Sequence, residues 1–225
     1  QYAQSNNIGS IAVGAATKAN GFNSLAMMRQ AYAGEQYAAA IGTAASAQGK
    51  ASLAMGHSAL AKGDQAIAIG SANPKPFEDD KHTQYTKYDG SSNTKANTAR
   101  AIAIGQGAKV VAGLTRDQKA FADGVAIGTQ AVSEGTQGVA FGNRAAHYRD
   151  NAVAIGNNAK TYAVDGVSIG NNAESGIQND PNYKVNNSVA VGNSARAHGG
   201  SGVALGNDTY ALGGSSVAAG NAAWA

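Results

Sequence analysis

Residues with catalytic or metal-binding chemistry are few and scattered in this sequence of 225 residues. There is no cysteine, which excludes disulfide bonds and thiolate metal sites. The histidines lie far apart, without the short spacing of zinc sites, at His57, His82, His147 and His198. Asp79 and Asp80 are adjacent but lack the further oxygen ligands that calcium takes. Gly105-Gln106-Gly107 resembles a phosphate loop without its third glycine or following helix. We therefore predict no catalysis, metal or cofactor.

Candidate binding residues are concentrated in one segment, from about residue 73 to residue 99. They combine aromatic rings that can bury area with cations that can orient a partner: Phe77, Lys81, Tyr85, Lys87 and Tyr88. Such a segment is either a recognition loop on a rigid scaffold or an insertion that the fold tolerates. Over the whole chain, 17 basic and 14 acidic residues give a net charge of +3 without a basic stripe, so nucleic acid is not a predicted partner.

The scaffold that must position these residues has a repeat of 14 residues, marked by the glycine of Val-Ala-Ile-Gly. The 13 markers are Gly14, Met28, Gly42, Gly56, Gly70, Gly105, Gly128, Gly142, Gly156, Gly170, Gly192, Gly206 and Gly220. Three longer intervals predict insertions at about 73–99, 108–123 and 174–186. A fixed period of this length is typical of a solenoid, so residues 1–225 are predicted to form a single β-roll domain.

Each repeat predicts two short strands and two tight turns, stacked so that the sheets are parallel. Before the marker, large apolar residues alternate with alanine or serine; after it, a second strand reads Ala-x-Ala-x-Gly. We expect the large residues to face inward against the alanines of the second strand. The residues between those alanines vary, which predicts solvent exposure, and His57, His147 and His198 are expected on the surface. Asparagines after six markers are expected to adopt positive φ in the turn.

The small residues of the first strand predict a contact between chains. They are alanine, serine or glycine in every repeat except at Met28, a restriction that a solvated face does not need. Alanine is also depleted in strands, so its constant use favours close approach by another backbone. A homo-oligomer about an axis parallel to the solenoid would use every repeat equivalently. Ala126, Ala154 and Ala190 are the predicted interface residues.

Two stretches carry a resemblance to a known family: Asn187-Ser-Val-Ala-Val-Gly-Asn-Ser-Ala195 and Asn151-Ala-Val-Ala-Ile-Gly156. They are similar to the head repeat of trimeric autotransporter adhesins of Gram-negative bacteria. The resemblance implies a left-handed parallel β-roll, three chains of which form a parallel trimer at the bacterial cell surface. The family's coiled-coil stalk and outer-membrane anchor have no counterpart in this sequence, so a head fragment without direct membrane contact is expected. The insertions and Met28 suggest a relation to a Moraxella-type surface protein.

The function that follows is adhesion. By the resemblance, candidate ligands are host-cell receptors and matrix proteins of the collagen, fibronectin and laminin class, and Asn187, Ser188 and Val189 belong to the family's matrix-binding motif. One alternative is an acyltransferase on a left-handed β-helix, whose six-residue repeat does not divide 14. Another is an ice-binding solenoid, which needs a regular exposed array, usually of threonine, that the varied second strand lacks.

Overall fold

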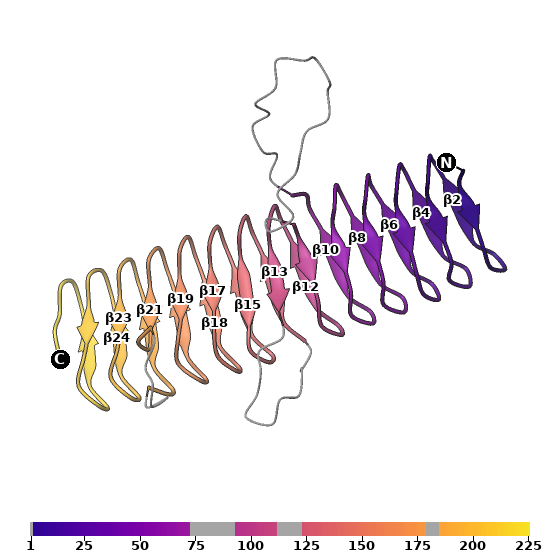
Figure 1. Cartoon of the computed structure of the whole chain (residues 1–225). Coiled ribbons are helices and arrows are strands. Elements are labelled where there is room, and N and C mark those ends of the chain that lie inside the picture. The colour runs from indigo at the N-terminus through magenta and orange to yellow at the C-terminus, as the bar shows by residue number, and fades with distance from the viewer. Residues whose placement is uncertain (1, 73–92, 112–122, 179–184) are drawn as a thin grey trace, which may run out of the picture. The chain divides into compact units, whose positions relative to one another are not determined.

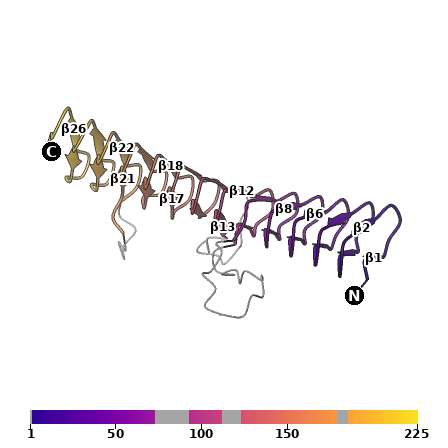
Figure 2. The same ribbon diagram turned by 90° about the horizontal axis from the view of Figure 1, so that it is seen from above.

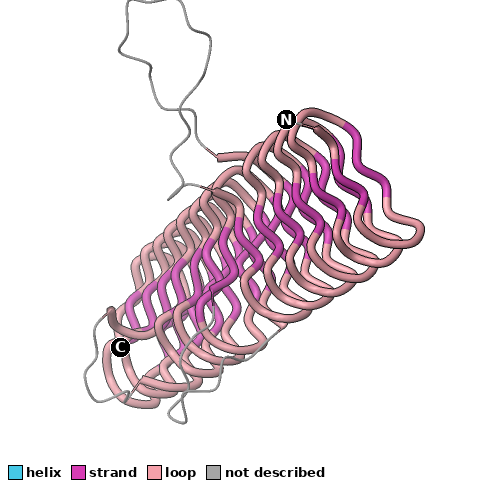
Figure 3. The backbone as a smooth tube through the Cα atoms, turned by 45° about the vertical axis from the view of Figure 1, so that its right-hand side comes forward, coloured by secondary structure: helices cyan, strands magenta, loops and turns pink. Residues whose placement is uncertain are grey.

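The computed structural model describes residues 2–72, 93–111, 123–178 and 185–225. These residues form 26 short strands joined by turns and no helix (Figure 3). The prediction of an all-β parallel solenoid with 14-residue coils is therefore confirmed. The handedness of the roll stays a prediction. The chain divides into two compact units, Gln1–Lys109 and Val110–Ala225.

The first unit stacks its coils so that first strands pair only with first strands, and second strands only with second strands (Figure 1). Its first strands, which precede the markers, are β2 (Ile11–Val13), β4 (Leu25–Met27), β6 (Ala39–Ile41), β8 (Leu53–Met55), β10 (Ile67–Ile69) and β12 (Ile102–Ile104). Its second strands are β1 (Gln4–Ser5), β3 (Lys18–Ala19), β5 (Tyr32–Ala33), β7 (Ser46–Ala47), β9 (Leu60–Ala61) and β11 (Lys95–Ala96). Ile67 pairs with Ile102, so the long interval between them leaves the register intact.

The second unit repeats this arrangement, and Figure 2 shows its successive coils from above. Its first strands are β14 (Val125–Ile127), β16 (Val139–Phe141), β18 (Val153–Ile155), β20 (Val167–Ile169), β22 (Val189–Val191), β24 (Val203–Leu205) and β26 (Val217–Ala219). Its second strands are β15 (Val132–Glu134), β17 (Ala146–His147), β19 (Lys160–Thr161), β21 (Glu174–Ser175), β23 (Arg196–Ala197) and β25 (Tyr210–Ala211). Strand β13 (Lys109–Val111) spans the boundary between the units.

The predicted insertions overlap regular coil residues at their ends. Lys95 in β11 pairs with Leu60, and β13 and β21 are second strands that begin at Lys109 and Glu174. The first interval interrupts the turn after a first strand, whereas the other two interrupt the turn after a second strand. The predicted extents of 73–99, 108–123 and 174–186 are therefore too wide.

The interior of the roll is made of small side chains, and the predicted orientation of the first strand is wrong. Alanines of both strands are fully buried, among them Ala26, Ala54, Ala68, Ala47 and Ala61. The large apolar residues that flank each first-strand alanine point outward instead. Two strands joined by tight turns enclose a narrow space that alanine side chains fill at normal packing density.

The marker glycines are required by stacking within one chain. Gly42 and Gly56 have φ of 133° and 114°, and a Cβ on Gly56 would overlap the carbonyl oxygen of Gly70 in the next coil. Met28 replaces the glycine with φ of 80°, within the left-handed half of backbone space. The small residues of this strand therefore reflect self-stacking and a narrow interior rather than approach by another chain.

Candidate interaction surfaces

The first strands carry an apolar face, defined as the outward residues at both ends of each first strand. In the second unit these residues include Val153, Ile155, Val189 and Val191, all half-buried in the single chain. Exposure is larger at Phe141, 52%, and Val217, 63%. In the first unit Ile11 is 55% exposed. Contiguous apolar surface of this kind marks an interaction site.

The predicted interface alanines do not belong to this face. Ala126, Ala154 and Ala190 are fully buried, and their side chains point into the roll. A side chain that packs against the opposite strand of its own coil cannot also contact another chain. The first strands still carry the candidate interface, but through the opposite side of each strand. The residues on either side of each alanine are the ones that a partner can reach.

The second strands carry a polar face, defined as the outward residue that opens each second strand and the outward residue two positions later. In the second unit this face gathers aromatic and charged side chains: Glu134, Tyr148, Lys160, Tyr162, Glu174, Arg196, His198 and Tyr210. The predicted solvent exposure of the variable positions holds for these residues, which are all partly exposed.

Aromatic rings stack along this face from coil to coil. The rings of Tyr148 and Tyr162 are parallel, with centroids 4.9 Å apart and an interplanar angle of 4°. The next residue in this column is Gly176, which has no side chain to cover Tyr162. Burial, followed by the neighbouring Tyr148 and Glu174, raises the pKa of Tyr162 to about 12, so its phenol stays protonated. Tyr210 stacks on Trp224 at 4.6 Å with a tilt of 30°.

Opposite charges alternate beside the tyrosines. Lys160, Glu174 and Arg196 occupy successive rungs, and with Asn158, Asn172 and other neighbours they line a hollow of about 190 Å³. His198 Nε2 lies 3.5 Å from the Glu174 carboxylate and lowers the pKa of this carboxyl; burial opposes the shift, and the neighbouring Arg196 and Lys160 lower the pKa further. Arg196 Nη1 donates to the hydroxyl of Tyr210 at 3.3 Å. The carboxylate of Glu174 therefore separates the two cations of this column.

A ladder of asparagines lines the turn after the markers, a feature that sequence reasoning missed. Each side-chain Nδ2 donates to the Oδ1 of the next at 2.8–3.0 Å, from Asn157 through Asn171, Asn193 and Asn207 to Asn221. The predicted role for these residues is wrong, because the following residue takes the positive φ, as Asn158 does at 55°. The sequence signal for this ladder was the recurrence of asparagine after successive markers, since residues one period apart lie in adjacent coils.

His147 is fully buried, which corrects its expected surface position. It points into the roll where other coils have small residues. Its Nε2 lies 2.6 Å from the Ser133 hydroxyl and its Nδ1 3.2 Å from the Arg149 carbonyl oxygen. Burial lowers the pKa of this imidazole. Room for the ring comes from Gly138, where a Cβ would overlap it.

The residues predicted to bind ligand fall into two groups. Phe77, Lys81, Tyr85, Lys87 and Tyr88 lie outside the described residues. The other three are consecutive but diverge: Asn187 is exposed in a turn, Ser188 is fully buried and Val189 lies on the apolar face. The side chain of Ser188 is therefore not available to a ligand.

The described residues offer neither a cluster of metal ligands nor a membrane-spanning helix. No group of three or more histidine, aspartate or glutamate side chains within residues 2–72, 93–111, 123–178 and 185–225 could hold a metal ion. Within the same ranges, there is no helix of the length and apolarity required to cross a membrane.

Comparison with known proteins identifies the repeat. A family model described as the YadA head domain repeat matches residues 5–27, 47–73, 92–108, 122–145, 150–173 and 186–209, more than half of the chain. A solved structure, the collagen-binding domain of the Yersinia adhesin YadA, is similar at 20% sequence identity and a TM-score of 0.39, covering 87% of this chain and 69% of that chain. No curated protein matches the sequence.

Proposed function

Because the chain belongs to the YadA head domain family, we propose that it attaches bacteria to a host extracellular-matrix ligand through the polar face of its second strands. Heads of this family are trimeric and non-enzymatic, and they stand on the cell surface, anchored in the outer membrane. A Moraxella-type relation stays a prediction. The different composition of the two faces supports the proposal, because the first strands present apolar residues and the second strands present aromatic and charged residues.

The apolar face is the surface that the trimer covers. It consists of the outward valine, isoleucine, leucine, methionine and phenylalanine residues of every first strand, so each coil contributes to the contact. Burying them supplies about 25 cal/mol per Å² of apolar area. A contact about a threefold axis leaves the second strands facing away from it, and the polar face then meets the ligand.

The stacked pair Tyr148–Tyr162 is the observation that carries the choice of ligand. Parallel tyrosine rings form an apolar shelf, and the next residue in their column, Gly176, places no side chain of its own over Tyr162. Proline-rich chains in the polyproline II conformation dock on aromatic surfaces of this type, and collagen winds three such chains. Collagen is therefore the first ligand to test, and three shelves per trimer raise avidity by about 10²–10⁴ where all can engage.

Two other locations compete with the shelf. One is the 73–99 segment with Phe77, Lys81, Tyr85, Lys87 and Tyr88, which has the composition of a recognition loop. The other is the turn at Asn187, beside Val189, which the family resemblance suggests. Fibronectin, laminin and cell-surface receptors are the ligands to test for these locations.

Surface plasmon resonance on immobilised triple-helical collagen tests the proposal. Tyr148→Ala/Tyr162→Ala should weaken binding, whereas Tyr32→Ala should not, because Tyr32 lies on the polar face but stacks on no other ring within the described residues. Deletion of residues 73–92 should leave the fold intact, since Ile67 pairs with Ile102 across it. Loss of binding on that deletion, with none in the tyrosine variant, would move the site to the 73–99 segment.

A further inference from the structure

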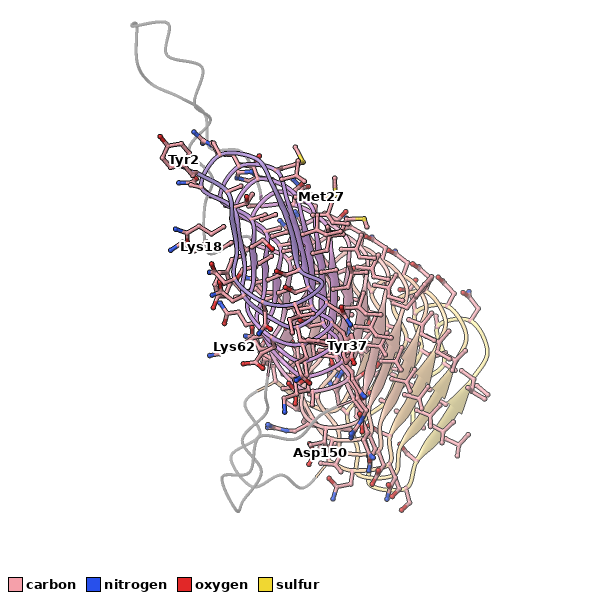
Figure 4. The ribbon with its side chains drawn as sticks, turned by 90° about the vertical axis from the view of Figure 1, so that its right-hand side faces the viewer. Tyr2, Lys18, Met27, Tyr37, Lys62 and Asp150 are labelled. Carbon is pink, nitrogen blue, oxygen red and sulfur yellow. The ribbon has the colours of Figure 1, made fainter. Side chains whose placement is uncertain are left out.

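The polar face of the first unit differs from that of the second in carrying cations without anions. Its outward residues include four lysines, Lys18, Lys62, Lys95 and Lys109, and no carboxylate. The side chains of Lys18 and Lys62 extend from the same side of the roll, opposite to Met27 on the apolar face (Figure 4). This face therefore has one sign of charge.

Three of these lysines are neighbours. The backbone N–H of Lys95 donates to the Ala108 carbonyl at 2.9 Å, which places Lys109 on the rung beside Lys95. Lys95 pairs on its other side with Leu60, and Lys62 is the next outward residue after Leu60. We call Lys62, Lys95 and Lys109 the lysine cluster. Their flexible stems can direct three ammonium groups toward one ligand.

No carboxylate in the described part of the chain forms an ion pair with this cluster. None of its three ammonium groups has an ion pair or hydrogen bond there. The nearby Asp64 uses a carboxylate oxygen to accept the backbone N–H of Lys50 at 2.8 Å. Like charges on adjacent rungs repel and destabilise a sheet. The second unit avoids this cost, since Glu174 separates Lys160 from Arg196.

We propose that the lysine cluster binds a sulfated polysaccharide, an extended polyanion whose sulfate groups take the place of the missing carboxylates. The strands that carry Lys95 and Lys109 lie about 4.8 Å apart, which lets their side chains reach neighbouring anionic groups of one polymer. On the described strands that carry the three lysines, no aromatic residue is available to stack on bases, so the cluster recognises charge and not nucleobases. This site is separate from the tyrosine shelf and does not depend on the collagen proposal.

Binding of the complete head to immobilised heparin, followed by surface plasmon resonance, tests the proposal. The triple variant Lys62→Gln/Lys95→Gln/Lys109→Gln should weaken binding by about tenfold or more, which corresponds to about 1.4 kcal/mol. Lys18→Gln/Lys50→Gln/Lys160→Gln removes the same charge from dispersed positions and is the matched control. It should change the affinity by less than about twofold, or about 0.4 kcal/mol.

Several outcomes would overturn the proposal. They are the absence of heparin binding, an equal loss in both triple variants, or undiminished binding to desulfated heparin. Single-stranded DNA that bound more tightly than heparin would identify the cluster as a nucleic-acid site instead. Collagen binding of the Lys62→Gln/Lys95→Gln/Lys109→Gln variant should be unchanged, so a failure of the collagen proposal is distinguishable from a failure of this one.

Discussion

The pairing of His147 with Gly138 is the most specific test of how the interior is packed. Gly138 lies on the inward side of its coil, and a Cβ there would overlap the His147 ring. Another coil of the roll has alanine at both equivalent places, Ala38 and Ala47, and both are fully buried or nearly so. Replacing His147 and Gly138 together by alanine therefore recreates a pair that the roll already accommodates.

The single substitutions should each be costly. Gly138→Ala forces the imidazole out of its site, an overpacking that costs about 1–3 kcal/mol per chain. His147→Ala leaves a cavity and removes the partner of the buried Ser133 hydroxyl, which lies 2.6 Å from the ring. Together these losses amount to about 2–5 kcal/mol. The double variant should be more stable than the sum of the single effects by about 1–3 kcal/mol.

Urea denaturation followed by circular dichroism, at one fixed protein concentration, measures the four stabilities of this cycle. Gly202→Ala is the matched control, since Gly202 has the same coil position and a Cβ there would lie 3.0 Å from the Gly199 carbonyl oxygen and 3.4 Å from that of Ala211, without overlapping a side chain. Gly202→Ala should lower the free energy of unfolding much less than Gly138→Ala does. Additive effects in the cycle, or equal costs at the two glycines, would refute the narrow interior.

The remaining predictions concern pH, the turns and the asparagine ladder. The lowered pKa of His147 means that the unfolded chain binds its proton first, so thermal stability should fall as pH drops below about 6.5, and His147→Ala should flatten that slope. Gly56→Ala should lower the free energy of unfolding, measured by chemical denaturation, by about 2–5 kcal/mol. Met28→Gly should raise it by about 0.5–1 kcal/mol, because glycine adopts the positive φ of this position without strain. The opposite signs would contradict the role of the markers in stacking the coils. Asn193→Ala breaks two ladder bonds and should cost about 0.5–1.5 kcal/mol in the same assay; no change would mean that the ladder is not stabilising.

The period was sufficient to predict the coils, because a repeat of 14 residues leaves few ways to stack parallel strands. It predicted the position of every first strand, including Ile67 and Ile102 on either side of the longest interval. It did not determine which side of the strand faces inward. The alternation of large and small residues fits either side of the strand facing inward. The usual rule that large apolar residues fill cores therefore predicted the wrong side.

The interior was misassigned because its width is set by the turns, which the sequence pattern does not reveal. The Gly138–His147 pair was the signal that could have corrected it, since one glycine accompanies the one large inward residue of the coil. The candidate sites were harder to predict. Tyr148 and Tyr162 meet only because their coils stack, and Ser188 and Val189 separate because neighbouring strand residues point to opposite sides.

The central claim is that the outward residues of the first strands hold the trimer together. The mass of an Ile155→Arg variant in solution tests this claim most directly. Ile155 lies on the apolar face, so arginine there would place three charges in the contact between chains. Lys160→Arg, on the polar face of the same coil, is the control. Sedimentation equilibrium should show a trimer for the control and for the unmodified head, and loss of the trimer for Ile155→Arg. A folded trimer that tolerates Ile155→Arg would contradict the account.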